Sequence, residues 1–85
     1  MAKVDVYTTT YCPYCVRGKQ LLDMKDVDYT EIDGTGDDAA RAALIEKSGG
    51  RRTVPQIFIN GQAIGGYDDM RALEESGKLD ALLAG

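Results

Sequence analysis

Four short segments rich in β-branched and apolar residues alternate with segments of helical spacing, and this order restricts the fold more than any other feature. The predicted strands span residues 3–9, 27–33, 54–60 and 62–65, and the predicted helices span residues 12–25, 37–48 and 65–85. A strand–helix–strand unit joins parallel strands by a right-handed crossover. The dipeptide Asn60-Gly61 instead predicts a two-residue hairpin between antiparallel strands. The sequence therefore predicts an α/β fold, ordered β-α-β-α-β-β-α along the chain.

Proline and glycine residues mark where the predicted helices begin and end. Pro13 suits the first turn of the first helix, where its missing N–H is not needed. Gly49 or Gly50 ends the second helix, and Gly77 breaks the last one. Gly18 lies inside the first helix, where it costs about 1 kcal/mol of helix propensity. We therefore expect the backbone at Gly18 to pack closely against a neighbouring element.

The apolar residues predict how these elements pack. The expected buried helical faces are Cys15, Val16, Leu21 and Leu22 in the first helix, and Met70, Leu73, Leu79, Leu82 and Leu83 in the last. Residues 57–59 are apolar on both faces of their strand, which places that strand at the centre of the sheet. One mixed four-stranded sheet, flanked by three or more helices on its two faces, satisfies these patterns.

Length and charge limit the kinds of partner. The 85 residues form one domain, which we place at residues 1–85. The net charge is −4 and the ten basic residues are scattered, which argues against nucleic acid as a partner. No apolar run approaches the roughly 18 residues of a membrane span, and the first ten residues lack a signal-peptide core. We expect a cytoplasmic monomer that does not bind membranes.

The only two cysteines, Cys12 and Cys15, stand at the start of the first predicted helix. Cys12 follows a strand and precedes Pro13, so it takes the N-cap position, where unpaired backbone N–H groups favour an anion. A thiolate is such an anion, and thiol–disulfide exchange requires a thiolate to attack a disulfide. Cys15 follows one turn later and is close enough to attack the sulfur of Cys12. This arrangement indicates a redox-active pair.

Other uses of the pair are less favourable. A structural disulfide closing so short a loop would contribute only about 2 kcal/mol in the chain-entropy description, and reducing compartments do not keep such bonds. The two thiols could instead pack as small apolar groups, or share a metal between two chains. Histidine is absent, which excludes Cys-His nucleophiles and His-containing zinc sites. Two cysteines also cannot complete a tetrahedral site within one chain, and we expect no metal site.

Three motifs in this order resemble the glutaredoxin family, on a thioredoxin-like fold. They are "CPYC" at 12–15, "TVP" at 53–55 and "GGYDD" at 65–69, and the resemblance covers nearly the whole chain. It implies glutathione as a co-substrate, with no bound cofactor. The implied glutathione-binding residues are Tyr14, Arg41, Thr53, Val54, Pro55, Gly66, Asp68 and Asp69.

The resemblance assigns a role to each part of this groove. The peptide bond before Pro55 is cis in the family, which leaves the Val54 N–H and C=O free to pair with the cysteinyl backbone of a bound peptide, as an added strand would. The alternative for Pro55 is an ordinary proline at the start of a strand. Tyr14 is expected to flank the reactive sulfur.

The start of the last helix is expected to bind the γ-glutamyl end of glutathione. Gly65 and Gly66 permit an unusual backbone there, so that the N–H groups of Asp68 and Asp69 can donate hydrogen bonds to the carboxylate. On the family pattern, the side chain of Asp69 pairs with the γ-glutamyl amine. The alternative is that Asp68 or Asp69 only caps the helix.

The chain departs from the family at Thr9. A lysine is common at this position in the family, three residues before the first cysteine, where it contacts the glycine carboxylate of glutathione. Arg41 falls where the family commonly has a Gln or Arg that contacts the same carboxylate. Arg17, Arg51 or Arg52 could substitute, and each arginine could equally be a solvated surface charge.

The resulting hypothesis is a glutathione-dependent thiol–disulfide oxidoreductase. Cys12 is the nucleophile and Cys15 the resolving cysteine, and the substrates are glutathionylated or disulfide-containing proteins. One alternative is a small thioredoxin-like reductant served by a flavoprotein reductase. Another is an iron–sulfur cluster carrier, in which Cys12 and glutathione thiols bridge two chains.

Overall fold

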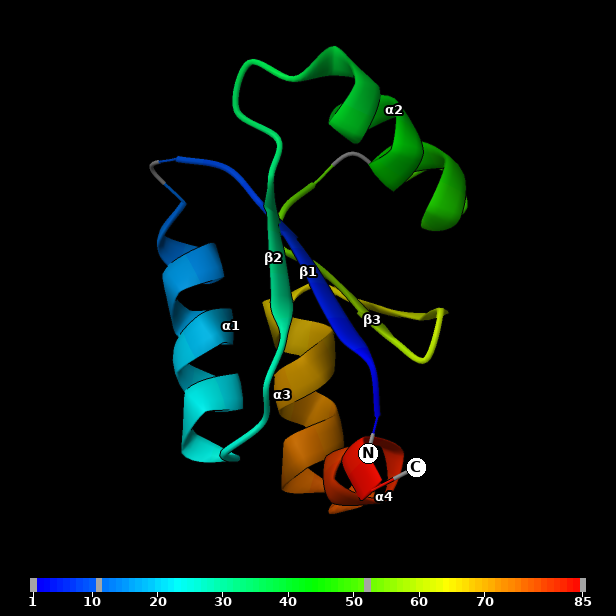
Figure 1. The fold of residues 1–85 in the computed structure, drawn as a ribbon. Helices are drawn as coiled ribbons and strands as arrows, with labels where there is room; N and C mark the ends of the chain where they lie inside the picture. The colour runs from blue at the N-terminus through cyan, green and yellow to red at the C-terminus, as the bar shows by residue number, and fades with distance from the viewer. Residues whose placement is uncertain (1, 11, 52, 85) are drawn as a thin grey trace.

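The computed structural model describes residues 2–10, 12–51 and 53–84 of the chain. Its elements follow the predicted order (Figure 1). They are β1 (Val4–Thr8), α1 (Pro13–Met24), β2 (Thr30–Asp33), α2 (Asp38–Lys47), β3 (Gln56–Ile59), β4 (Gln62–Gly65), α3 (Tyr67–Glu75) and α4 (Lys78–Ala84). No helix in these three ranges has the length and apolar character that crossing a bilayer requires.

The four strands form one mixed sheet in the order β2-β1-β3-β4. β1 runs parallel to β2 and antiparallel to β3, and β3 pairs antiparallel with β4. Every residue of β3 is buried, which confirms its predicted central position. Asn60 and Gly61 connect β3 to β4 with φ angles of 53° and 81°, as a type I′ hairpin requires. The predicted mixed sheet is therefore confirmed.

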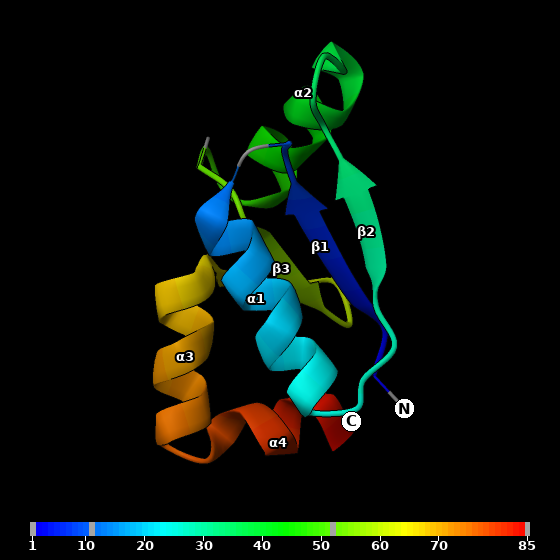
Figure 2. The same cartoon turned by 90° about the vertical axis from the view of Figure 1, so that its left-hand side faces the viewer.

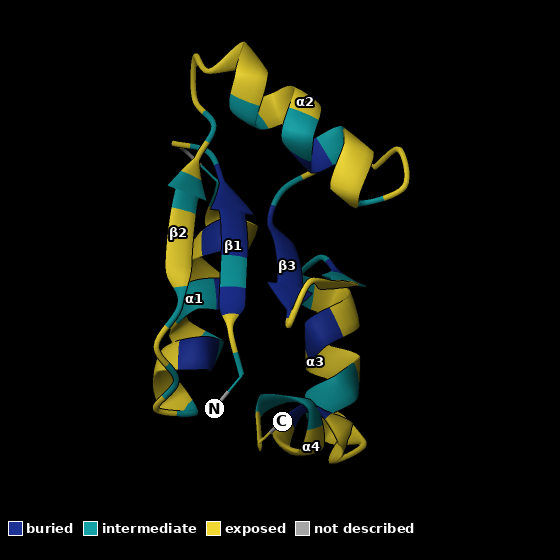
Figure 3. Cartoon of the chain, turned by 45° about the vertical axis from the view of Figure 1, so that its right-hand side comes forward, coloured by how far each residue is buried: buried dark blue, intermediate teal, exposed yellow. Residues whose placement is uncertain are grey.

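The helices cover the two faces of the sheet unequally. α1, α3 and α4 lie on one face and α2 lies on the other (Figures 1 and 2). The core on the first face consists of Val4, Val6, Leu22, Ile57, Ile59, Met70 and Leu79. The smaller core on the second face consists of Tyr7, Leu44 and Phe58. Figure 3 shows the buried residues concentrated on β1, on β3 and on the inner sides of the helices.

Glycines end the helices where the sequence predicts. α2 ends at Lys47, and Gly49 and Gly50 follow with φ angles of 76° and 103°. Gly77 has a φ angle of 78° and separates α3 from α4, which confirms the predicted break in the last helix. This backbone conformation is one that residues with a Cβ rarely adopt.

Some details of the prediction are wrong. The third strand begins at Gln56 rather than at residue 54, and the last helical segment begins at Tyr67 rather than at residue 65. The second strand begins at Thr30 rather than at residue 27, because its first partner on β1 is Asp5. Val16 does not share the buried face of α1 with Cys15 and Leu22, since it is half exposed. One residue advances a helix by about 100°, which turns Val16 away from the core.

We expect Gly18→Ala to stabilise the fold. Gly18 is buried, and a Cβ there would lie 3.6 Å from Pro55 Cγ and 3.7 Å from Met70 Cε, which are ordinary contacts. The substitution should raise the free energy of unfolding by about 0.5–1 kcal/mol, through helix propensity. Urea denaturation measures this gain. Gly65→Ala is the opposing control, because its φ angle of 115° and the overlap of a Cβ with Asp69 should lower stability. A loss of stability in Gly18→Ala would mean that the space beside Pro55 is tighter than these contacts indicate.

Candidate active site around Cys12 and Cys15

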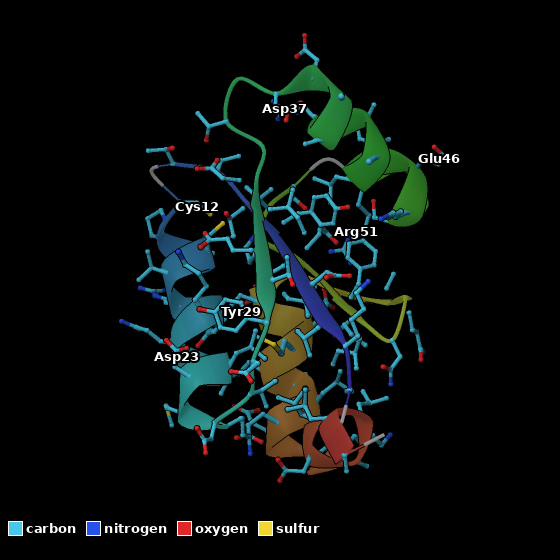
Figure 4. The ribbon with its side chains drawn as sticks, viewed as in Figure 1. Cys12, Asp23, Tyr29, Asp37, Glu46 and Arg51 are labelled. Atoms are coloured by element: carbon cyan, nitrogen blue, oxygen red, sulfur yellow. The ribbon has the colours of Figure 1, made fainter. Side chains whose placement is uncertain are left out.

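Cys12 immediately precedes α1, in the segment that follows β1. Its backbone is extended, with φ −119° and ψ 101°, and its sulfur accepts a hydrogen bond of 3.2 Å from the Cys15 N–H. The thiol also donates to the Val54 carbonyl at 3.7 Å. Cys12 therefore occupies the N-cap, as predicted, and its sulfur lies between the first turn of α1 and the segment before β3. Figure 4 shows its position at the start of α1.

Cys15 differs from Cys12 in its surroundings, although both are free thiols. Cys15 is only 2% exposed, whereas Cys12 is partly exposed. Burial, together with its hydrogen bond to Cys12, raises the pKa of Cys15 to about 12, against smaller opposing effects of the Thr9 backbone and Lys19. At neutral pH Cys15 is thus a shielded thiol one turn behind an accessible one.

A groove of about 240 Å³ runs beside this pair, between the first turn of α1, the segment before β3 and the start of α3. Its lining residues are Tyr14, Arg51, Thr53, Val54, Pro55, Gly66, Tyr67, Asp68 and Asp69. The Val54–Pro55 peptide bond is cis, as the family resemblance implies. The fold brings together every residue predicted for glutathione except Arg41.

Arg41 lies on the other side of Val54. It lines a small cavity of about 20 Å³, together with Thr9 and Val54. This places it beside the position where the family commonly has a lysine. Of the other arginines considered, Arg17 lies over the Tyr14 ring at 5.4 Å, and Arg52 falls outside the described residues.

Asp69 both caps α3 and lines the groove. Its Oδ2 accepts a 3.0 Å hydrogen bond from the Gly66 N–H, at the start of α3. The same oxygen accepts from Arg51 Nη2 at 3.2 Å. Both side chains are about half exposed, at 48% and 49%. The carboxylate therefore caps the helix and faces the groove with an arginine beside it.

Arg51 lies in the segment between α2 and β3 (Figure 4), and its guanidinium reaches the Asp69 carboxylate. Its N–H donates to Ser48 Oγ at 3.1 Å, and the Ser48 hydroxyl donates to the Arg51 carbonyl at 3.0 Å. The guanidinium lies against Gly65, where a Cβ would come within 2.7 Å of Nη1. The sequence offered Arg51 only as a substitute for Arg41. Its pairing with Asp69 depends on a turn that no motif marks.

Tyr67 is a lining residue that the sequence reasoning missed. Its ring lies 6.4 Å from that of Tyr14, and the two rings form one wall of the groove. Its place between Gly66 and Asp68 in the third motif was the available signal. The part of the chain that the structure describes contains no cluster of three or more metal-ligating His, Cys, Asp or Glu side chains.

Comparison with known proteins gives one consistent family. Residues 4–64 match the family model described as Glutaredoxin. The chain is 54% identical over 84 residues to a glutaredoxin of Pseudomonas aeruginosa, covering 99% of each chain. It is 52% identical over 83 residues to glutaredoxin 3 of Escherichia coli, covering 98% of this chain and 99% of that one. A crystal structure of a buckwheat glutaredoxin–glutathione complex superposes with a TM-score of 0.87 at 38% identity, covering 98% of this chain and 77% of that one.

We expect Cys15 to resist alkylation at neutral pH. In Cys12→Ser, burial still raises the pKa of Cys15 above the ordinary cysteine value, so little reactive thiolate exists near pH 7. Alkylation by iodoacetamide, followed by mass spectrometry, should be slow at pH 7 and accelerate steeply toward pH 11. The same variant unfolded in urea provides the control and should react much faster at pH 7. Equal rates for the folded and unfolded variant would contradict the shielded position of Cys15.

Proposed function

The chain belongs to the glutaredoxin family of glutathione-dependent thiol oxidoreductases, and we propose that Cys12 is its nucleophile and Cys15 its resolving cysteine. One observation carries this assignment. The accessible thiol lies at the N-cap of α1 and within 3.7 Å of the Val54 carbonyl, at the edge of a groove lined by the residues expected to bind glutathione.

Two routes follow from this arrangement. With a glutathionylated protein, the Cys12 thiolate attacks the glutathione sulfur, the protein thiol leaves, and a second glutathione releases the first as glutathione disulfide. With a protein disulfide, Cys12 forms a mixed disulfide with the protein, and Cys15 attacks Cys12 to release it. The proposed partners are thus glutathione and glutathionylated or disulfide-containing proteins, acted on by a monomer in the reducing cytoplasm.

The groove supports one orientation of glutathione. The tripeptide lies extended and pairs its cysteinyl backbone with Val54, as an added strand would. Its γ-glutamyl end lies at Gly66 and Asp69, where the carboxylate oxygen already accepts two N–H donors. Its glycine end passes Val54 toward Thr9 and Arg41, which line the adjoining small cavity. Each charged end of glutathione then meets a charge of opposite sign.

We expect the two cysteine variants to separate the two routes. Cys12→Ser should abolish all activity, because the attacking sulfur is lost. Cys15→Ser should retain deglutathionylation and lose most protein-disulfide reduction. The assay couples glutathione and glutathione reductase to a small glutathione mixed disulfide, and a second assay uses a protein disulfide. The assignment is reversed if Cys12→Ser stays active while Cys15→Ser loses both activities.

We expect substitutions at the two ends of the groove to weaken the binding of different parts of glutathione. Asp69→Asn retains an oxygen that can cap α3 and removes the charge, so the KM for glutathione should rise roughly tenfold or more. Arg41→Met should also raise the KM for glutathione, by a smaller factor because its position is open to solvent.

γ-Glutamylcysteine provides the matched control for these variants, because it lacks the glycine residue. With this thiol as reductant, Asp69→Asn should still raise the KM, whereas Arg41→Met should have no effect. An Arg41→Met variant that behaves like the parent with both thiols would show that Arg41 is only a surface charge. If Asp69→Asn behaves like the parent, the side chain only caps α3.

A further inference from the structure

A second cleft opens beside the two cysteines, and its charged side chains have no role in the mechanism above. The cleft has a volume of about 540 Å³. Its lining residues are Thr9, Thr10, Cys12, Pro13, Cys15, Val16, Lys19, Glu31 and Asp33. It shares no lining residue with the groove proposed for glutathione. Three charged side chains therefore face a space that also contains both sulfur-bearing residues.

The helical spacing in α1 and the register between β1 and β2 determine where these charged side chains lie. Lys19 follows Cys15 by four residues, so the two side chains lie on one side of α1. Glu31 is the register partner of Val6, and Asp33 is the partner of Thr8. Partners share a face of the sheet, and Val6 belongs to the core that α1 covers. Glu31 thus projects toward α1 from the edge strand.

Hydrogen bonds fix the ammonium group of Lys19 in this cleft. Lys19 Nζ donates to Glu31 Oε2 at 2.9 Å, and the Thr8 hydroxyl donates to the same oxygen at 2.8 Å. Thr8 is only 2% exposed, so the carboxylate is held from the buried side of the sheet. The contact raises the pKa of Lys19 and lowers the pKa of Glu31. The pair therefore remains ionised at neutral pH.

We propose that Lys19, positioned by Glu31 and Thr8, stabilises the negative charge that develops on the Cys15 sulfur when Cys15 resolves a mixed disulfide. The inference rests on the proposed roles of the two cysteines. Lys19 is a positioning residue for this step and forms no bond to the substrate.

Cys15 loses its thiol proton to water in the cleft, and its sulfur attacks the Cys12 sulfur of the Cys12–S–S–R intermediate. The Cys12–Cys15 bond forms as the bond between Cys12 and the R sulfur breaks. The R–S⁻ group leaves with the electron pair and is protonated by solvent. Over this step and the preceding formation of the mixed disulfide, the cysteine pair is oxidised by two electrons and the substrate disulfide is reduced by two.

The charges around Cys15 explain why a cation is needed there. In the mixed disulfide Cys12 carries no charge, but the carboxylates of Glu31 and Asp33 line the same cleft from β2. A buried thiol that must become an anion is disfavoured by burial and by neighbouring negative charge. Of the charged side chains that line this cleft, Lys19 carries the positive charge, and it lowers the pKa of Cys15 against the effect of burial.

The decisive variant is Lys19→Met, which keeps the length of the side chain and removes its charge. Reduced protein is mixed with glutathione disulfide and quenched in acid at short times, and mass spectrometry separates the glutathionylated intermediate from the oxidised pair. We expect Lys19→Met to slow conversion of the intermediate roughly three- to tenfold, where tenfold corresponds to one pKa unit, so that more intermediate accumulates. Lys19→Arg should restore most of the rate.

Lys25→Met is the matched control. Lys25 is the C-cap residue of α1. It forms ion pairs with Glu74 and Asp80, at the opposite end of α1 from the cysteines. Lys25→Met changes the net charge by the same amount as Lys19→Met and should leave the rate of conversion of the intermediate unchanged. In a Cys15→Ser background, Lys19→Met should not alter deglutathionylation, since no resolving step occurs.

The inference is wrong if Lys19→Met leaves the rate of conversion of the intermediate unchanged, or if Lys25→Met slows that conversion equally. It is also wrong if Lys19→Met slows deglutathionylation by the same factor in the Cys15→Ser background. If the parent protein itself forms no glutathionylated intermediate and releases no glutathione, the proposed function fails instead.

Discussion

The hydrogen bond from the Cys15 N–H to the Cys12 sulfur is the contact around which the site is organised. It satisfies an N–H group that would otherwise lack a partner at the start of α1. It also holds the Cys12 sulfur at the start of α1. The second contact of that sulfur, with the Val54 carbonyl, joins it to the segment before β3. Two segments 42 residues apart in sequence, the start of α1 and the segment before β3, thereby meet at one atom.

The two sides of the first turn of α1 carry different chemical groups. The side toward α3 presents backbone groups, two tyrosine rings and the Asp69 carboxylate, which suit an extended peptide with charged ends. The side toward β2 presents Lys19 and two carboxylates, close to the buried thiol. A single turn of helix thus leaves Cys12 partly exposed and buries Cys15 beside these charged side chains.

The sequence predicted the features that depend on local signals. Asn60-Gly61, Gly77 and the apolar run at 57–59 determined the hairpin, the helix break and the central strand. Motif resemblance identified most of the groove. The motifs could not predict the Arg51–Asp69 contact or the Lys19–Glu31 contact. Each contact joins two segments whose relative position is set only by how the whole chain packs. Val16 was misplaced because an apolar residue one position from a buried cysteine does not share its helical face.

The Arg51–Asp69 pair has a consequence for how the groove receives a charged ligand. Ion pairs between half-exposed side chains contribute little to stability, typically 0–1 kcal/mol. Exchanging Arg51 for the amine of glutathione at this carboxylate therefore costs little. Meanwhile the Gly66 N–H keeps the carboxylate oriented, because that hydrogen bond belongs to the helix start and not to the ligand. On the proposed binding mode, Asp69 is thus oriented before the ligand arrives, and the released guanidinium stays near the γ-glutamyl carboxylate.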